Sequence, residues 1–506
     1  MSGFARLLRA EWTKLRTVRG WTAGTVAAAL LVTVLGLLFA NASHSSCSNG
    51  PVEVPCPAPL IGPGGQAVDD RFYFVHQPLD GDGAITVRIT SMTGQIRLPD
   101  STPGLRNVTA GVVPWAKAGV MVKESTKQGS PYAAVMLTGD HGVRMQHNFT
   151  EDVAGKPGKS PRWLRITRTG DTITGEESAD GRRWTTVGTA RLAGLPSRVR
   201  IGLFAASPGD LRVSRNAIGG SVSADRFAEV TAIMDQVGVR GAATGRSWSR
   251  DDIGVSYELD GVTPHHPGGL ARSGGTFTIT GVGDIAPTPG GSRVENTLIG
   301  LVVGLIVILV VAVLFVTAEY RRGLIRTTLT ASPRRGRVLA AKAVVIGAAA
   351  FLSGLVAAAV TVLAGKRILS GNGMHLLPLS ALTELRVIVG AAGLFAVSAV
   401  LALALGALLR RSAIAVIAAV VAVILPYVLG VASILPEEVS EWLLRLTPAA
   451  GFAVLQSVPE YAHVLGHYAP VAGYYPLPPW GGFAVTCAYA GLALALAAVR
   501  LREEDG

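Results

Sequence analysis

The feature that most constrains this chain is an uninterrupted apolar run, residues 296–318, followed directly by a basic segment. The run NTLIGLVVGLIVILVVAVLFVTA has no charged residue and is long enough to cross a bilayer as one helix. The segment behind it, residues 319–342, carries seven Arg or Lys residues against one acid, Glu319. A further apolar run begins at Ala343. Because basic segments beside membrane spans stay in the cytoplasm, we expect 319–342 to be cytoplasmic.

Other apolar runs predict further spans, and their number fixes where the chain ends lie. The predicted spans besides 296–318 are residues 20–40, 343–364, 387–409, 413–434 and 481–499. Six spans place both termini in the cytoplasm, and Arg410 and Arg411 would form an inner turn. Residues 3–19 place apolar side chains at helical spacing opposite Arg and Lys, which predicts a helix lying on the inner membrane surface. Ala40-Asn41-Ala42 has the form of a signal-peptidase site, but the apolar run before it is longer than a secretory signal needs, which favours a retained helix.

Between the first two spans the composition changes, and residues 42–295 are expected to be extracellular. Residues 42–65 are rich in Pro and Gly and read as a linker. Residues 66–295 contain short alternating runs such as AITVRITS, separated by Gly, Pro and Asp, a pattern typical of a β-sandwich. ADRFAEVTAIMDQ, residues 224–236, is interpreted as a short helix. GGTFTITGVGDIAP, residues 274–287, returns to strand character just before the membrane.

The charge and the cysteines narrow the class of protein. The net charge of +12 is concentrated in the segments assigned to the cytoplasm, so we predict membrane topology rather than nucleic-acid binding. Cys47 and Cys56 lie close together on the predicted external side, where a disulfide can persist. Cys487 falls within a predicted helix and is interpreted as a small packing residue.

The sequence offers no catalytic or metal-binding constellation. No GxxxxGK[ST] phosphate-binding loop occurs, so this chain is expected to bind no cofactor, and any ATP would be bound by another subunit. The spans have almost no ionisable residues, which disfavours an ion-coupled secondary transporter. His141 and His147 lack a set of metal ligands, and Asp80, Asp82 and Asp140 are interpreted as turn residues.

Aromatic residues of the β-rich region have two readings. They could form a platform for a sugar or an apolar ligand, or they could be core residues on alternating strands. The candidate platform residues are Tyr73, Trp115, Tyr132, Trp163 and Trp184. Within the spans, Gly300 and Gly304 match a helix-packing motif, and Pro426 is expected to kink the fifth span.

The membrane part resembles permease subunits of the type-2 ABC transporter family. The motifs that carry this resemblance are RLLRAEWTKLRTVRGW, EYRRGLIRTTLTASPRRGRVLAAK and LLRLTPAAGFAVLQSVPE. It implies six spans, an elbow helix at 3–19, a second permease subunit and two ATP-binding subunits. It also implies a coupling segment within the cytoplasmic loop 319–342. The coupling residues carried onto this sequence are Glu319, Tyr320, Arg321, Arg326, Arg334, Arg335 and Arg337.

The insert is similar to concanavalin-like jelly-roll domains of the DUF1349 kind. The motifs are DDRFYFVHQPLDGDGAITVRITS, WAKAGVMVKES and VRIGLFAASP, among others. In that family a strand like residues 274–285 precedes the first strand, whereas here it follows the domain. We therefore expect the last strand to pair near the first and tie the domain to the second span. The resemblance transfers no catalytic residue.

These patterns predict a six-helix permease of the plasma membrane with an extracellular β-sandwich between helices 1 and 2. Its expected function is export powered by a separate ATPase. Two alternatives are a membrane-anchored sensor that binds envelope glycan and a surface enzyme that processes glycan. Six spans with a basic loop and an elbow helix are more than an anchor needs, which favours transport. Whether the basic loop only sets topology or also docks the ATPase stays open at this point.

Overall fold

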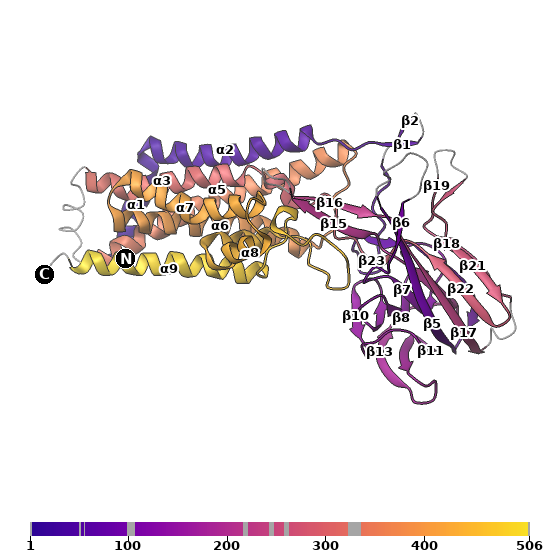
Figure 1. Cartoon of the computed structure of the whole chain (residues 1–506). Coiled ribbons are helices and arrows are strands. Elements are labelled where there is room, and N and C mark those ends of the chain that lie inside the picture. Colours follow the sequence, from indigo (N-terminus) through magenta and orange to yellow (C-terminus); the bar gives the residue numbers. More distant parts are fainter. Residues whose placement is uncertain are drawn as a thin grey trace.

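The computed structural model of the chain describes residues 3–49, 52–54, 56–98, 107–215, 221–241, 247–257, 263–321 and 335–503. It has a bundle of long helices and a β-rich region beyond one end of the bundle (Figure 1). Both chain ends lie at the opposite end of the bundle. We call these the β-proximal end and the terminus-bearing end.

Six helices in the described part of the chain are long and apolar enough to span a membrane, as predicted. They are α2 (Arg19–Ala42), α3 (Leu301–Arg321), α5 (Arg335–Gly371), α6 (Ala381–Leu409), α7 (Ser412–Val431) and α9 (Pro479–Glu503). The remaining helical elements are α1 (Gly3–Thr17), α8 (Glu437–Leu446) and the 3₁₀ helices η1 (Val294–Leu298), η2 (Pro448–Leu455) and η3 (Pro470–Ala472).

Two helices begin well before the hydropathy pattern predicts. α5 starts at Arg335 rather than Ala343, and α6 starts at Ala381 rather than 387. Both early turns carry charged residues, which lower hydropathy but are good helix formers. The predicted loop 319–342 is therefore helical at both of its ends.

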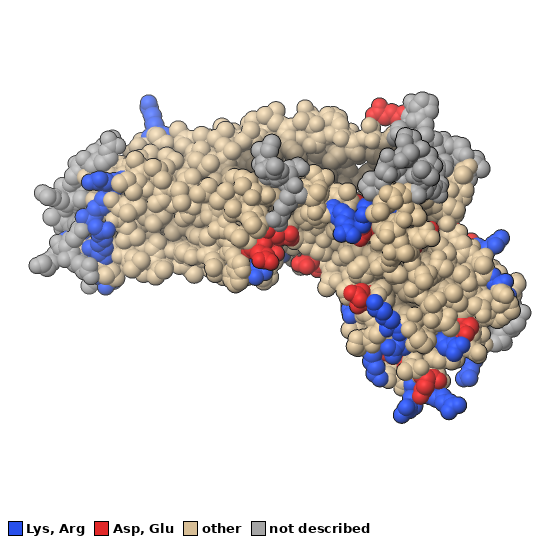
Figure 2. Space-filling view, in the orientation of Figure 1, with Lys and Arg blue, Asp and Glu red and all other residues tan. Residues whose placement is uncertain are grey.

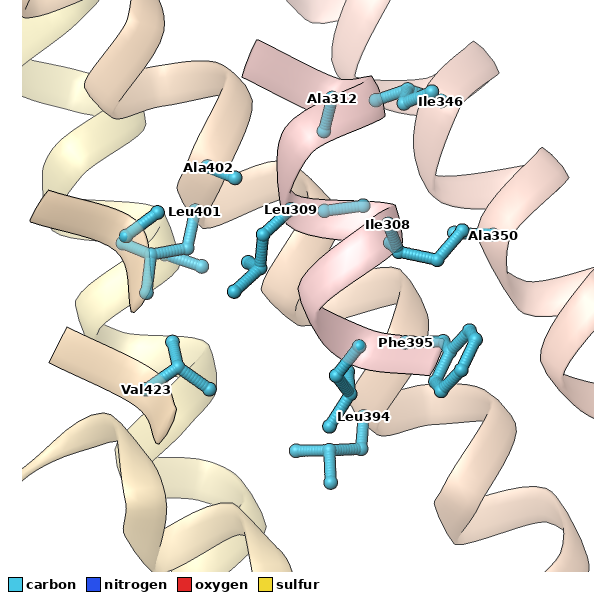
Figure 3. Packing of buried hydrophobic residues seen from close by; sticks show 14 of the residues in the cluster. Ile308, Leu309, Ala312, Ile346, Ala350, Leu394, Phe395, Leu401, Ala402 and Val423 are labelled. Atoms are coloured by element: carbon cyan, nitrogen blue, oxygen red, sulfur yellow. The ribbon is translucent and has the colours of Figure 1, made fainter. Parts of the chain in front are cut away.

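The core of the bundle forms around α3 and α6. Figure 3 shows side chains of α3, including Ile308, Leu309 and Ala312, between side chains of α5 and α6. Glycine lets α2 approach closely, because a Cβ on Gly304 would come within 2.4 Å of Val32 Cγ2. The expected close packing at Gly300 and Gly304 is thus made against α2.

The β-rich region is a sandwich of two antiparallel sheets. The first runs in the order β10 (Glu151–Ala154), β9 (Val143–His147), β8 (Tyr132–Thr138), β7 (Lys117–Lys123), β14 (Arg198–Ala206), β4 (Phe72–Asp80) and β18 (Ser249–Ile253). The second runs in the order β13 (Thr185–Arg191), β12 (Thr172–Ser178), β11 (Arg162–Thr169), β5 (Gly83–Arg97), β17 (Ala228–Gly241), β22 (Thr276–Gly281) and β21 (Gly269–Ser273), with β6 (Val108–Ala110) on β5. Apolar side chains from both sheets, such as Val120 and Val87, fill the space between them.

Four short strand pairs complete this region. They are β1 (Cys47–Asn49) with β2 (Val52–Val54), β3 (Val68–Asp70) with β23 (Ile285–Pro287), β15 (Asp210–Arg215) with β16 (Ser221–Arg226), and β19 (Ser256–Tyr257) with β20 (Pro264–His265). The pairing of β23 with β3 brings the end of the insert beside its beginning, but the strand expected to pair there, residues 274–285, is β22. β22 instead joins the second sheet, between β17 and β21.

The prediction of a short helix at residues 224–236 is wrong. Most of this stretch lies in β17, which pairs with β5 and β22. Ala228, Val230, Ala232 and Met234 are buried at alternate positions, the period of a strand. The helix-favouring composition is overridden by pairing on both sides.

The segment between α7 and α9 folds back into the bundle. η2 is buried along its whole length and lies among α6, α7 and α9. Trp442 and Trp480, which flank it in sequence, are each more than half exposed. Residues 448–455 therefore dip into the bundle from its β-proximal end.

Candidate functional site

Basic side chains gather at the terminus-bearing end of the bundle (Figure 2). Some of them hold helix ends together. Arg335 Nη1 donates to Leu501 O at 2.8 Å, and Arg500 Nη1 donates to Leu408 O at 2.9 Å. Both bonds satisfy carbonyls in the last turns of α9 and α6, where an α-helix leaves its acceptors unpaired.

A buried cluster of charges lies behind this basic end. Lys342 Nζ donates to Glu319 Oε1 at 2.6 Å and to Glu11 Oε2 at 2.8 Å. Lys14 Nζ bonds Glu11 Oε1 at 2.8 Å and Glu319 Oε1 at 3.1 Å. Lys342 is 2% exposed, Glu11 1% and Glu319 5%. We call Glu11, Lys14, Glu319 and Lys342 the charge cluster.

The charge cluster joins three helices. Glu11 and Lys14 come from α1, Glu319 from the end of α3 and Lys342 from the second turn of α5. Its two lysines balance its two glutamates. Since removing one partner of a buried pair leaves an uncompensated charge, the cluster fixes α1 against both helices that flank residues 322–334.

The structure separates the predicted coupling residues into different settings. Glu319 is buried in the charge cluster, and the Tyr320 ring lies under Arg410, 5.4 Å from its guanidinium carbon. Arg335 is held by Leu501 O, and Arg337 is exposed. Arg321 is the last residue of α3, while Arg326 and Arg334 lie outside the described residues.

Sequence reasoning missed three of the four members of the charge cluster. The available signal was compositional: Glu11 is the lone acid of a basic helix, and Glu319 is the lone acid of the basic segment. Isolated acids among basic residues indicate partners, but the sequence does not say which ones.

The five candidate platform rings do not share one surface. Tyr132 is fully buried, Trp115 is 5% exposed and Tyr73 is 7% exposed. Trp163 and Trp184 are half-buried, with Arg88 and Arg165 over their rings. At most two of the five are therefore placed to meet a ligand.

The polar residues interpreted as structural make local contacts. His141 stacks on Trp115 with ring centroids 4.0 Å apart. Asp82 accepts a hydrogen bond from Gly170 N, and Asp80 pairs with Arg198. In the described ranges no three His, Cys, Asp or Glu side chains gather as a metal would require. Cys47 and Cys56 form a disulfide that closes the β1–β2 hairpin, with Cα atoms 4.9 Å apart.

Buried ion pairs lie on the face of the first sheet that turns away from the second. Lys123 Nζ bonds Asp70 Oδ2 at 2.8 Å, and Lys117 Nζ bonds Asp284 Oδ1 at 2.6 Å. Asp70 belongs to β3, and Asp284 directly precedes β23. These pairs hold the β3–β23 ribbon, and with it the chain leading into α3, against the sandwich.

The segment between α7 and α9 also contacts the β-rich region. His463, 4% exposed, donates from Nε2 to Phe149 O at 2.8 Å. Burial lowers the pKa of His463, while its bond to Phe149 and the nearby Asp152 and Asp284 oppose that shift and Lys117 adds to it. The segment that carries η2 is thereby attached to the sandwich.

A cavity of about 1400 Å³ lies between the sandwich and the β-proximal end of the bundle. Its walls come from both parts of the molecule. The bundle contributes residues of α2, α3, α7 and η2, and the β-rich region contributes β3, β15, β16 and the ribbon strand β23.

Comparison with known proteins gives one informative match. The family model described as "ABC-2 family transporter protein" matches residues 123–506, which is more than half of the chain. No curated protein matches the chain.

Two solved structures are similar to part of the chain. One is the crystal structure of a functionally unknown protein from Saccharomyces cerevisiae, with TM-score 0.23 and 13% identity, covering 37% of this chain and 83% of that one. The other is SCP-B, of the eqolisin family of peptidases, in complex with a tripeptide, with TM-score 0.24 and 10% identity, covering 42% and 98%. At these TM-scores neither similarity carries a conclusion about this chain.

Proposed function

Because the chain belongs to the ABC-2 transporter family and is a membrane permease component of an ABC transporter, we propose that it exports its substrate, driven by separate ATP-binding subunits. The observation that carries this proposal is the family match together with the charge cluster beneath the basic end. ATP would be bound by the partner subunits. The permease would act as a pair, with one ATP-binding subunit for each permease.

The proposed docking surface is the terminus-bearing end around residues 319–337. Exposed Arg337 and the basic residues that border residues 322–334 would meet acidic groups of the ATPase. The charge cluster supports this role because it ties α1, α3 and α5 together directly behind that surface. A displacement of residues 322–334 by the ATPase would then move all three helices as one unit.

The proposed orientation places the terminus-bearing end in the cytoplasm and the sandwich outside the cell. Support comes from the asymmetry of basic side chains, which favours retention of that end. The disulfide between Cys47 and Cys56 agrees with an oxidising compartment for the β-proximal end.

The proposed pairing of permeases uses apolar side chains that the single chain leaves exposed. On α2, Leu30, Val34 and Leu38 are each at least half exposed. On α5, Leu352 and Val356 are also more than half exposed. In a bilayer, lipid and a second permease would share these faces.

The test of the docking proposal is a double charge reversal at the proposed surface. Arg321→Glu with Arg326→Glu should let the permease insert normally yet weaken its recovery with the co-expressed ATP-binding subunit. Losing each buried charge-assisted contact costs about 1–3 kcal/mol, so binding should fall by at least about tenfold. The readouts are co-purification and stimulation of ATP hydrolysis.

The matched control reverses two charges at the other end of the molecule. Arg182→Glu with Arg183→Glu changes two exposed arginines of the sandwich and should leave ATPase binding unchanged. If the first double variant inserts, binds the ATPase and transports as the unaltered protein does, residues 319–337 serve topology only and the docking proposal fails.

A further inference from the structure

The cavity between the bundle and the sandwich has an apolar wall. This wall consists of side chains near the β-proximal ends of the helices, namely Phe39, Ile299, Val302, Val431 and Phe452. Ile299 is 57% exposed, so part of the wall is accessible. An apolar surface of this kind favours hydrocarbon over water.

Arg293 lines the same cavity and is built into place. It is 5% exposed, its Nη2 donates to Pro289 O at 2.9 Å, and its guanidinium lies 4.2 Å from the centre of the Tyr474 ring. The Tyr474 hydroxyl donates to the same carbonyl at 3.0 Å. Arg293 Nη1 is buried and makes no hydrogen bond within the described part of the chain. A fixed guanidinium therefore presents one unused donor group.

Glu295 offers an unused acceptor in the same place. Its Oε1 accepts from Ser457 N at 3.2 Å, whereas its buried Oε2 has no hydrogen-bond partner among the described residues. A Cβ added to Gly473 would lie 2.9 Å from Arg293 Nη1 and 4.0 Å from Glu295 Oε1. The unused nitrogen of Arg293 and the carboxylate of Glu295 thus lie beside the same glycine.

Three other charged residues of the cavity wall are already paired. Arg71 bonds Asp69 through two nitrogens, each at 2.6 Å, Arg226 bonds Asp210, and Asp284 bonds Lys117. Arg293 and Glu295 differ from these residues because each keeps a buried polar atom without a partner. A buried polar atom without a hydrogen-bond partner costs free energy. Both atoms therefore favour a ligand that makes the missing hydrogen bonds.

We propose that this cavity binds a zwitterionic amphiphile. Its anionic group would accept hydrogen bonds from Arg293, its ammonium group would donate to Glu295, and its hydrocarbon would lie on the wall formed by Phe39, Ile299 and their neighbours. The identification of this ligand as the transported molecule rests on the proposed function. The binding itself does not, and it can be measured on the permease without ATP or the ATPase.

The probe is dioctanoyl-phosphatidylethanolamine, titrated into the purified full-length permease and followed by native mass spectrometry and thermal unfolding. Dioctanoyl-phosphatidylcholine has the same phosphate and chains, but its quaternary ammonium has no N–H to donate to Glu295. Phosphoethanolamine has the head without chains. We expect the ethanolamine lipid to bind at least about tenfold more tightly than either, a difference of about 1.4 kcal/mol.

The variants locate the binding. Arg293→Gln should weaken binding of the ethanolamine lipid at least tenfold, and Glu295→Gln should remove the preference for ethanolamine over choline. Arg71→Gln is the matched control, because it removes a cavity arginine whose Nε and Nη2 already bond Asp69, and it should bind as the unaltered protein does. If Arg293→Gln does not fold, two other measurements test the inference. One uses Arg293→Lys, which keeps the charge but loses the forked guanidinium. The other is the comparison of the two lipids on the unaltered protein.

Three results would overturn the inference. The two lipids could bind equally, phosphoethanolamine could bind as tightly as the ethanolamine lipid, or Arg293→Gln and Arg71→Gln could lose the same amount of binding. Each result leaves the proposed function standing if the ATPase still docks and drives transport. Conversely, selective lipid binding by a permease that recruits no ATPase would overturn the proposed function and leave the binding site in place.

Discussion

Lys342 Nζ lies 2.6 Å from Glu319 Oε1, and this contact joins the two helices between which residues 322–334 run. The same carboxylate oxygen accepts from Lys14 of α1. One buried carboxylate oxygen of α3 is therefore shared with lysines of α1 and α5. Lys342 also donates to Glu11 of α1 at 2.8 Å, so α1 is joined to α5 directly as well as through Glu319.

Lys342→Met should loosen α1 from the bundle. The substitution keeps the apolar stem but leaves Glu11 and Glu319 buried with only Lys14, whose side chain is 37% exposed, as a cation. Breaking a buried pair in this way costs about 3–5 kcal/mol. Hydrogen exchange of α1 should become faster, and stimulation of the ATPase should fall even where its binding is retained.

Lys366→Met is the control on the same helix. Lys366 pairs with Glu384 at 2.7 Å near the other end of α5, with 36% and 20% of the two side chains exposed. Exposed pairs contribute about 0–1 kcal/mol, so this variant should leave α1 and ATPase stimulation unaffected. Equal effects of the two variants would show that the charge cluster has no special role in holding α1.

The proposed orientation predicts which surface cysteines an impermeant maleimide can reach on intact cells. Ser273→Cys lies at an exposed position on β21, and Thr17→Cys lies at an exposed position on α1. In a Cys487→Ala background, Ser273→Cys should react at once, whereas Thr17→Cys should react only after permeabilisation. The reverse labelling pattern would show the opposite orientation, with the sandwich inside the cell.

The elements of the fold were largely predictable because their patterns are local. An apolar run of 20 residues needs no tertiary information to be a candidate span, and the alternation in β5 is visible residue by residue. β17 shows the limit of this reasoning. Its Ala, Glu and Met residues suggested a helix, while the burial of Ala228, Val230 and Ala232 depends on β5 and β22, which lie far away in sequence.

The sites were less predictable because they depend on contacts between distant segments. Glu319 was singled out for its position beside a basic loop, yet its setting depends on Lys342 and on α1, and Glu11 lies 331 residues from Lys342. Arg293 and Glu295 look like ordinary charges at the start of a span. Their burial requires residues 457–474 to fold over them. No sequence pattern at residues 293–295 or at residues 457–474 predicts this contact.

The attachment of residues 456–478 to the sandwich should weaken as the pH falls. Burial lowers the pKa of His463 from its ordinary value near 6.5. The folded state therefore favours the neutral ring, which donates from Nε2 to Phe149 O. Its contribution to stability is fully present above pH 6.5 and is lost as the pH falls through that value toward the lower pKa of the folded state.

Hydrogen exchange around Phe149 and His463, followed between pH 8 and pH 5 and corrected for the intrinsic rate, measures this loss. Protection should fall at acidic pH in the unaltered protein. His463→Gln keeps a donor but does not titrate, so its protection should change less with pH.

Burial also lowers the pKa values of His76 and His147. The unaltered protein and His463→Gln therefore both retain some acid sensitivity, and the difference between them isolates His463. His375→Gln, which removes an exposed histidine bonded to Cys56 O, should behave as the unaltered protein does. If His463→Gln and the unaltered protein lose protection in parallel, protonation of His463 does not control this attachment.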